Sequence, residues 1–228
     1  ADIIDLGACS TRPGAETCDA TTEEARIAVG AEAVRSVSAD IPLSVDTFRA
    51  SVARSAVERE ADIINDISGG DLDPEMMPTV ASLHVPYIMM HMRGTPATMQ
   101  SMCDYPEGVV AEVVAELSRK IERFRLAGVA DIIADLGLGF AKTVGQNYEL
   151  LRATAEIEEL LGTPVLIGLS RKSMLTRPLG ITAAEALEAT TAANTLALVN
   201  GAAILRVHDV KAAVEAREIV SLTYPTPA

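Results

Sequence analysis

The sequence predicts an α/β protein of the (β/α)8 TIM-barrel class that lacks its first strand in this chain. Two observations predict this class. Seven short apolar segments alternate with helical stretches, as in a parallel sheet whose strands are buried on both faces. Most of these segments also end in a polar residue, and a barrel gathers the carboxyl ends of all its strands around one mouth. The polar residues are Asp46, Asn65, His91, Asp135, Ser170 and Arg206.

The expected strands set the order of the fold. They are residues 3–6, 43–46, 63–66, 87–90, 132–135, 165–168 and 203–206. An open, doubly wound sheet is the alternative, but it would carry a glycine-rich turn after its first strand, and none is present. A closed barrel leaves no unpaired edge, so we expect an eighth strand upstream of Ala1. The chain also starts directly in a strand without an initiator methionine, which predicts an N-terminally incomplete barrel.

Two helices are clear from their patterns. Residues 183–200 are rich in Ala and Leu, and residues 107–126 repeat apolar side chains at helical spacing before a stop at Gly128. The apolar positions of the second stretch are Val110, Val114, Leu117, Ile121 and Phe124. Because no composition break or linker interrupts the chain, residues 1–228 are predicted to form a single domain.

Composition excludes several function classes. The chain of 228 residues has a formal net charge of -13, which disfavours nucleic acid as a partner. No apolar run approaches the roughly 18 residues of a membrane span. The three cysteines (Cys9, Cys18 and Cys103) contain no CxxC pair and indicate free thiols in a reducing cytoplasm. A small anionic ligand remains possible, because a few cations can reverse the field inside a cleft.

Acceptors at strand ends form the first candidate site. Asp46, Asn65 and Asp135 could read the edge of a flat heterocycle, since a carboxylate accepts two N–H bonds at once. The alternative is that Asp46 or Asp66 caps the next helix. In segment 9–15, a Pro-Gly turn would lift Arg12 over the mouth to hold an anion, unless that side chain is only a solvated loop arginine.

Cations at later strand ends form the second candidate site. Arg171 and Lys172 are adjacent, so one is expected to point inward and the other to make a surface ion pair. Arg206 and His208 lie two residues apart on an extended segment and share a face suited to a diphosphate. The glycines of segment 135–143 allow close approach of a ligand, whereas Lys142 is interpreted as a solvated loop lysine. His84 and His91 are expected to be structural or hydrogen-bonding residues.

In order and spacing, the segments resemble the dihydropteroate synthase family. The motifs that carry the resemblance are Ser10–Gly14, Ser44–Thr47, Ile64–Asp66, His91–Pro96, Gly137–Phe140, Ser170–Ser173 and Arg206–Val210. The resemblance implies a cytoplasmic, usually homodimeric TIM barrel that joins 4-aminobenzoate to 6-hydroxymethyl-7,8-dihydropterin diphosphate and releases diphosphate, assisted by Mg²⁺. It also implies similarity to known sulfonamide targets, because those drugs mimic 4-aminobenzoate.

The resemblance further implies residue roles. Asp46, Asn65, Asp135 and Lys172 would form the pterin pocket, Arg206 and His208 would anchor the diphosphate, and Thr11, Arg12, Pro13 and Ser170 would shape the aminobenzoate site. Lys172, Arg206 and His208 would then be the catalytic residues. No metal ligand is assigned, because the family's metal-linked Asn is expected upstream of Ala1.

Three features depart from the family pattern. Cys9 replaces a carboxamide or acidic residue, Leu136 and Ala141 replace Pro and Gly, and the opening strand with its loop is absent. Two other functions stay open, a pterin-dependent methyltransferase and a non-catalytic pterin-binding module. The methyltransferase would not need the Ser170–Ser173 segment or the Arg206/His208 pair.

Overall fold

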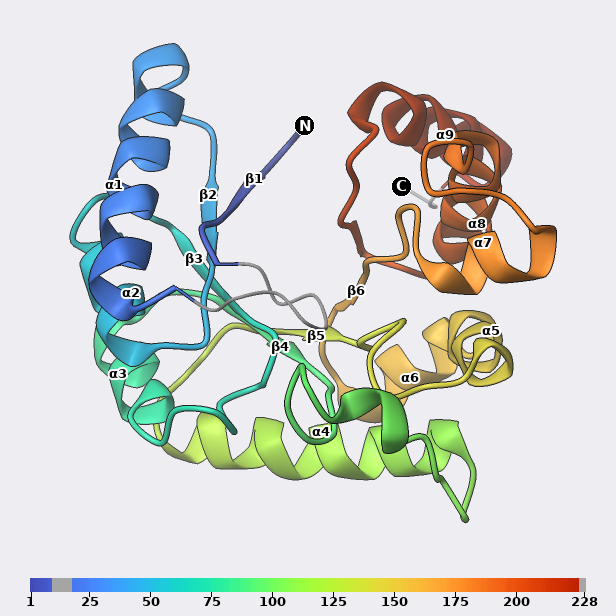
Figure 1. Cartoon of the computed structure of the whole chain (residues 1–228), viewed down its shortest axis with the longest axis horizontal. Coiled ribbons are helices and arrows are strands. Elements are labelled where there is room, and N and C mark those ends of the chain that lie inside the picture. The colour runs from blue at the N-terminus through green and yellow to red at the C-terminus, as the bar shows by residue number, and fades with distance from the viewer. Residues whose placement is uncertain (10–17, 226–228) are drawn as a thin grey trace.

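The computed structural model describes residues 1–9 and 18–225, and it contains one parallel sheet of seven strands in sequential order (Figure 1). The strands are β1 Ile4–Gly7, β2 Leu43–Asp46, β3 Ile63–Asp66, β4 Tyr87–Met90, β5 Ile132–Asp135, β6 Val165–Ile167 and β7 Ile204–Leu205. All seven strands fall within or beside the predicted segments. The fold class is therefore confirmed, as a curled sheet with β1 and β7 at its edges. The eighth strand stays a prediction.

Helices lie around the outside of the curled sheet (Figure 1). They are α1 Ala20–Val37, α2 Ala50–Val57, α3 Met76–Leu83, α4 Val109–Leu126, α5 Val144–Arg152, α6 Thr154–Leu161, α7 Ser173–Leu179, α8 Leu187–Val199 and α9 Val210–Thr223, with a short 3-10 helix at Met99–Ser101. In the described part of the chain, no helix is long and apolar enough to cross a membrane.

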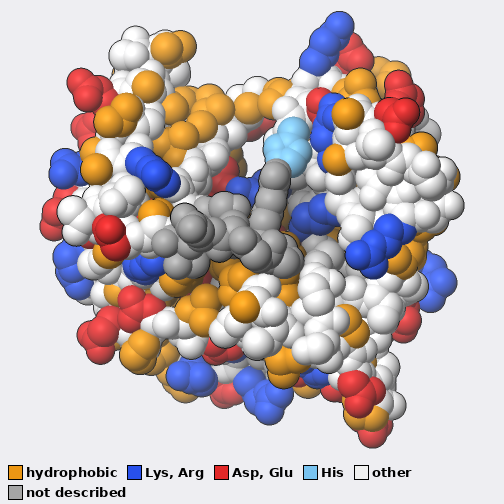
Figure 2. Space-filling view, in the orientation of Figure 1, with side chains coloured by type: hydrophobic (Ala, Val, Ile, Leu, Met, Phe, Trp, Pro, Cys, Tyr) orange, Lys and Arg blue, Asp and Glu red, His pale blue; other side chains and the backbone are white. Residues whose placement is uncertain are grey.

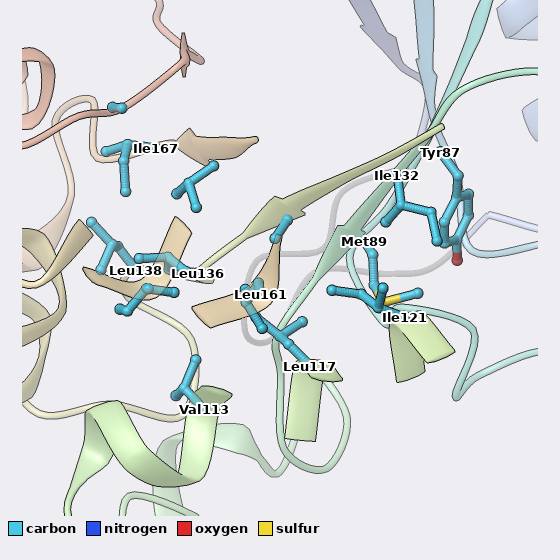
Figure 3. Close-up of a cluster of buried hydrophobic side chains, with 14 of the residues drawn as sticks. Tyr87, Met89, Val113, Leu117, Ile121, Ile132, Leu136, Leu138, Leu161 and Ile167 are labelled. Atoms are coloured by element: carbon cyan, nitrogen blue, oxygen red, sulfur yellow. The ribbon is translucent and has the colours of Figure 1, made fainter. Parts of the chain in front are cut away.

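Helix α4 closes the main core against β3, β4 and β5. Tyr87 of β4 stacks on Phe124 with ring centroids 4.9 Å apart, and its hydroxyl donates to Asp66 at 2.7 Å. Figure 3 shows Met89 and Ile132 of the sheet near Leu117 and Ile121 of the helix. The innermost helix positions are Val109, Val113, Leu117, Ile121 and Phe124. The predicted stripe was therefore wrong by one residue at its start, where Val110 and Val114 are only half-buried.

The predicted helix at 183–200 begins later than expected. Thr182 donates from its backbone N–H and its hydroxyl to the Glu185 carboxylate, at 2.9 and 2.8 Å. The Glu185 N–H in turn donates to the Thr182 carbonyl, so this stretch forms a turn. The helix starts only at Leu187, because an apolar composition alone does not reveal a side chain that caps a turn.

Strand register places the polar strand ends side by side. Asp46 of β2 is paired with Asn65 of β3, and Met90 of β4 with Asp135 of β5. Parallel strands in register bring all their carboxyl ends to one end of the sheet. This is the end at which the sequence predicts the site.

Candidate active site

A polar layer lies one pleat above an apolar layer at the inner face of the sheet. The lower layer is a cluster of inward-facing side chains, Ile3, Ile63, Ile88, Ile133, Leu166 and Ile204. Side chains two residues apart on a strand share a face. The residue two positions further on is therefore also inward-facing, which gives Asp5, Asn65, Met90, Asp135, Gly168 and Arg206. Strand alternation alone thus builds a mouth with an apolar floor and a polar rim.

Arg206 joins the two edges of the sheet across this mouth. Its Nε donates to Asp5 Oδ2 of β1 at 2.6 Å, and its Nη2 donates to Asp46 Oδ2 of β2 at 3.0 Å. Asn65 Nδ2 also donates to Asp5 Oδ2, at 3.1 Å. The structure therefore brings together three predicted residues, Asp46, Asn65 and Arg206. The Asp46 side chain does not cap α2, whose first N–H is held by Asp73 instead.

Asp5 is a site residue that the sequence analysis missed. Its side chain is 18% exposed, and its buried Oδ1 has no hydrogen-bond partner among the residues that the structure describes. The available signal was an acidic residue inside an apolar strand, because charged side chains are rarely buried unless they are paired or functional. The unpaired oxygen can accept a hydrogen bond from a bound molecule.

Burial raises the pKa of Asp46 to about 7, with the neighbouring charge of Asp5 as the next cause. Arg206 acts in the opposite direction and lowers this pKa. The protonation state of Asp46 therefore changes near neutral pH. At this pH its side chain can donate a hydrogen bond to a ring nitrogen or accept one from a ring N–H group.

The stability of the protein should depend on Asp46 between about pH 4 and pH 7. The folded-state pKa is raised above the unfolded value, so the folded state binds more protons in this window. The contribution of Asp46 to the free energy of unfolding is therefore present at low pH. It is lost as the pH rises to 7, by up to about 1.4 kcal/mol per pH unit for one proton. Urea titrations of the protein and of Asp46→Asn should show a shallower slope in the variant. Equal slopes would contradict the assignment.

Asp135 and Lys172 lie on the opposite side of the mouth. Asp135 is 7% exposed, and its Oδ1 accepts from the Gly137 N–H at 2.8 Å. Lys172 Nζ donates to the Leu138 carbonyl at 2.5 Å and lies 4.8 Å from the centre of the Phe140 ring. Burial lowers the pKa of Lys172 to about 8, while Asp135 raises it. Both predicted residues are thus held by the β5–α5 loop beside the polar layer.

Arg171 points away from Lys172, as the sequence predicts for one of two adjacent cations. Its Nε and Nη2 donate to the two carboxylate oxygens of Asp209, at 2.9 and 2.8 Å. Asp209 occupies the cap position of α9, but its side chain makes no capping bond because it pairs with Arg171. This bidentate pair fixes the segment that carries His208.

The remaining candidates differ in how well the structure places them. Ser170 is buried, and its hydroxyl accepts from the backbone N–H of His208 at 3.3 Å, so these two predicted residues are neighbours. The His208 side chain is exposed. Thr11, Arg12 and Pro13 lie outside the described residues. Asp66 binds the N–H groups of Ser68 and Gly70, and therefore caps a turn.

Lys142 is not a solvated loop lysine, and that interpretation was wrong. It is 5% exposed, and its Nζ reaches His91 Nδ1 at 2.9 Å and the carbonyls of Gly137 and Phe140 at 3.1 and 3.0 Å. Burial lowers the pKa of His91 to about 4, so its neutral ring accepts from Lys142 and donates through Nε2 to Glu116, 2.9 Å away. His91 is a hydrogen-bonding residue, as expected.

This network fixes the loop that carries the Lys172 acceptor. Gly137 has a φ of +63°, and a Cβ there would lie 1.9 Å from the His91 carbonyl oxygen, so only glycine fits. Lys142 binds both residues of this close approach, His91 and Gly137. The chain after β4 and the β5–α5 loop are therefore locked together next to Asp135.

Replacing Lys142 by methionine should destabilise the fold. The change keeps the apolar stem but removes three buried donations, and the unpaired acceptors should cost about 2–4 kcal/mol of unfolding free energy. Urea denaturation would measure this loss, with Lys211→Met as the control because the Lys211 side chain is 90% exposed. A loss as small as that of the control would contradict the buried network.

Magnesium does not fit the groups that the described residues bring together. Among those residues, one group of three potential ligand atoms lies close together, from Cys9, Cys18 and Glu23. Two of its atoms are sulfur, whereas Mg²⁺ takes oxygen ligands. The carboxylates of Asp5 and Asp46 already share Arg206. No step of the chemistry is therefore derived through this ion.

The fold and the site together define a parallel α/β barrel protein whose mouth carries carboxylates and cations above an apolar floor. A family model described as "Pterin binding enzyme" matches residues 1–208. The chain belongs to this family of pterin-binding enzymes.

The relatives agree along almost the whole chain. Dihydropteroate synthase of Synechocystis sp. is 44% identical over 93% of this chain and 73% of its own length. The structure of Yersinia pestis dihydropteroate synthase with a sulfonamide drug complex superimposes with a TM-score of 0.94 at 35% identity, covering 99% of this chain and 82% of that chain. The Xanthomonas albilineans synthase with 4-aminobenzoic acid gives a TM-score of 0.91 at 37% identity, covering 100% and 81%.

Proposed function

We propose that this chain is a dihydropteroate synthase, a transferase of folate synthesis. It condenses 6-hydroxymethyl-7,8-dihydropterin diphosphate with 4-aminobenzoate to give 7,8-dihydropteroate and diphosphate. The observation that carries the proposal is the polar layer of Asp5, Asp46, Asn65, Asp135 and Arg206 on an apolar floor. This layer offers acceptors for the N–H groups of a pterin ring and a cation for its anionic substituent.

The proposed ring pocket combines hydrogen-bonding side chains with a cation. Asp135 and Asn65 present buried acceptors and donors for the ring edge, and Lys172 supplies a cation for a carbonyl or ring nitrogen. Because Asp135 already accepts from Gly137 through one oxygen, the other is left to bind the ring. A flat heterocycle with alternating donors and acceptors matches this arrangement.

The reaction replaces one bond at the exocyclic methylene carbon. The carbon–oxygen bond to diphosphate breaks, and the amine nitrogen of 4-aminobenzoate forms the new carbon–nitrogen bond and then loses a proton to solvent. Arg206 and His208 are proposed to stabilise the negative charge on the departing diphosphate. A neutral amine attacks an electron-poor carbon. Little general-base catalysis is therefore needed if the diphosphate departs before the amine attacks.

The proposal extends to three further properties. A homodimer is supported by exposed apolar side chains on α8 and α9, namely Leu196, Val199, Ile219 and Leu222. A reducing cytoplasm is supported by the free cysteines Cys9, Cys18 and Cys103. A role for Mg²⁺ rests on the family resemblance. Sedimentation analysis and activity in the presence of a chelator would test the first and the last.

One assay separates this function from its alternatives. Purified protein is mixed with the pterin diphosphate, Mg²⁺ and 4-aminobenzoate, and diphosphate release is followed together with formation of the dihydropteroate. Release that depends on 4-aminobenzoate supports the synthase. Pterin binding without release would support a non-catalytic module, and methyl transfer to a corrinoid without release would support a methyltransferase.

A further inference from the structure

Two cysteines that the proposed reaction does not use lie close together after β1 and before α1. Cys9 follows β1, and Cys18 directly precedes Asp19, the cap residue of α1. Their sulfur atoms lie within 4.8 Å of each other, and the Cys18 N–H donates to Cys9 Sγ at 3.1 Å. Both side chains are half-buried. A disulfide needs a sulfur–sulfur distance of about 2.05 Å, and rotation of two cysteine side chains on adjacent backbones can close a gap of this size.

A buried charged pair lies against these sulfurs. Glu23 is fully buried and binds Arg49, and within residues 1–9 and 18–225 its Oε1 has no hydrogen-bond partner. Arg49 also donates to the Cys18 carbonyl at 2.8 Å. Burial lowers the pKa of Arg49, but hydrogen bonding to Cys9 and the charge of Glu23 more than offset this and raise it. Arg49 therefore lies within hydrogen-bond reach of the Cys9 side chain, whereas burial and then the neighbouring Cys9 raise the pKa of the Cys18 thiol.

The same three ligand atoms could suggest a soft-metal site, but the charge arrangement disfavours it. The carboxylate of Glu23 is already shared with Arg49, whose positive charge would lie next to a bound dication. Structural zinc sites also take four ligands, and this group offers three. Two thiols beside a cation, with a short stretch of chain between them, fit thiol–disulfide exchange better than metal binding.

We propose that Cys9 and Cys18 are a reversible disulfide pair that, when oxidised, ties the chain after β1 to the start of α1. Cys9 attacks a small-molecule disulfide and releases one thiol, which leaves a mixed disulfide on Cys9. The Cys18 thiol loses its proton and attacks the Cys9 sulfur, which releases the second thiol. In total, two protein thiols and one small disulfide become one protein disulfide and two small thiols.

The bond would join two elements of the fold covalently. It would link Cys9, which follows β1, to Cys18, which precedes the cap residue of α1. A cross-link of this kind restricts the unfolded chain. Oxidation is therefore expected to raise the midpoint of urea denaturation.

Mass spectrometry tests the bond without any reference to activity. The whole protein is equilibrated with reduced and oxidised glutathione, its free thiols are blocked with N-ethylmaleimide, and it is cut at Glu16, which lies between the two cysteines. We expect the two fragments to stay joined, at a mass lower by two hydrogen atoms, with Cys103 blocked. Cys103→Ser should retain the bond, and Cys9→Ser and Cys18→Ser should abolish it.

The outcomes separate the proposal from the function. Separate fragments with both cysteines blocked would overturn the disulfide, as would zinc that protects both thiols and survives dialysis. A bond that forms without raising the midpoint of urea denaturation would overturn its stabilising role. Absence of turnover in the fully reduced protein would instead overturn the proposed function and leave the mass result standing.

Discussion

Replacing Lys172 by alanine should lower kcat/KM by about 100-fold or more, a loss of about 3 kcal/mol of transition-state stabilisation. Among charged groups, Lys172 has the largest lowering effect on the pKa of Asp135, and its Nζ is fixed on the Leu138 carbonyl. The variant would leave the buried carboxylate of Asp135 without its main positive neighbour. Steady-state kinetics with both substrates would measure the effect.

Binding of the free pterin separates a ring-binding role from a structural one. Calorimetry with a pterin that lacks the diphosphate should show weaker binding to Lys172→Ala and to Asp135→Asn, by about 1–3 kcal/mol each. Lys211→Ala is the control, since Lys211 makes only an exposed ion pair with Glu215. Unchanged affinity in both site variants, with the fold intact by circular dichroism, would remove Asp135 and Lys172 from the ring pocket.

The strands were predictable because strand burial leaves a direct trace in the sequence. Ile63–Asp66 is apolar until Asn65, and Tyr87–Met90 is followed by the polar residue His91, where each chain reaches the carboxyl end of the sheet. The same period of two places Asn65 and Asp135 on the inner face. The polar end of a buried strand therefore predicts the strand and the site together.

What the sequence could not give is pairing between distant segments. Asp5 and Arg206 are separated by 201 positions and meet only because the sheet curls. The prediction of a solvated Lys142 was wrong because its hydrogen-bond acceptor, His91, lies 51 positions away in the sequence. Charged side chains in loops can thus be assigned only once the fold shows which buried acceptors they reach.

Replacing Arg206 by alanine should weaken binding of the pterin diphosphate by about 100-fold, and binding of the free pterin much less. The guanidinium is 44% exposed and lies at the rim of the mouth, where a diphosphate attached to the ring would extend. Some loss for the free pterin is expected, because Arg206 also pairs with Asp5 and Asp46. His208→Ala should follow the same order of effects.

Arg217 provides a matched control for this change. Its side chain is 43% exposed and binds two carboxylates, those of Asp2 and Glu218, so Arg217→Ala removes the same charge and a similar pair of contacts away from the mouth. That variant should bind both ligands normally. If Arg206→Ala lost affinity equally for the pterin with and without diphosphate, Arg206 would serve the ring pocket through Asp5 and Asp46. The anchor for the departing diphosphate would then have to be another residue.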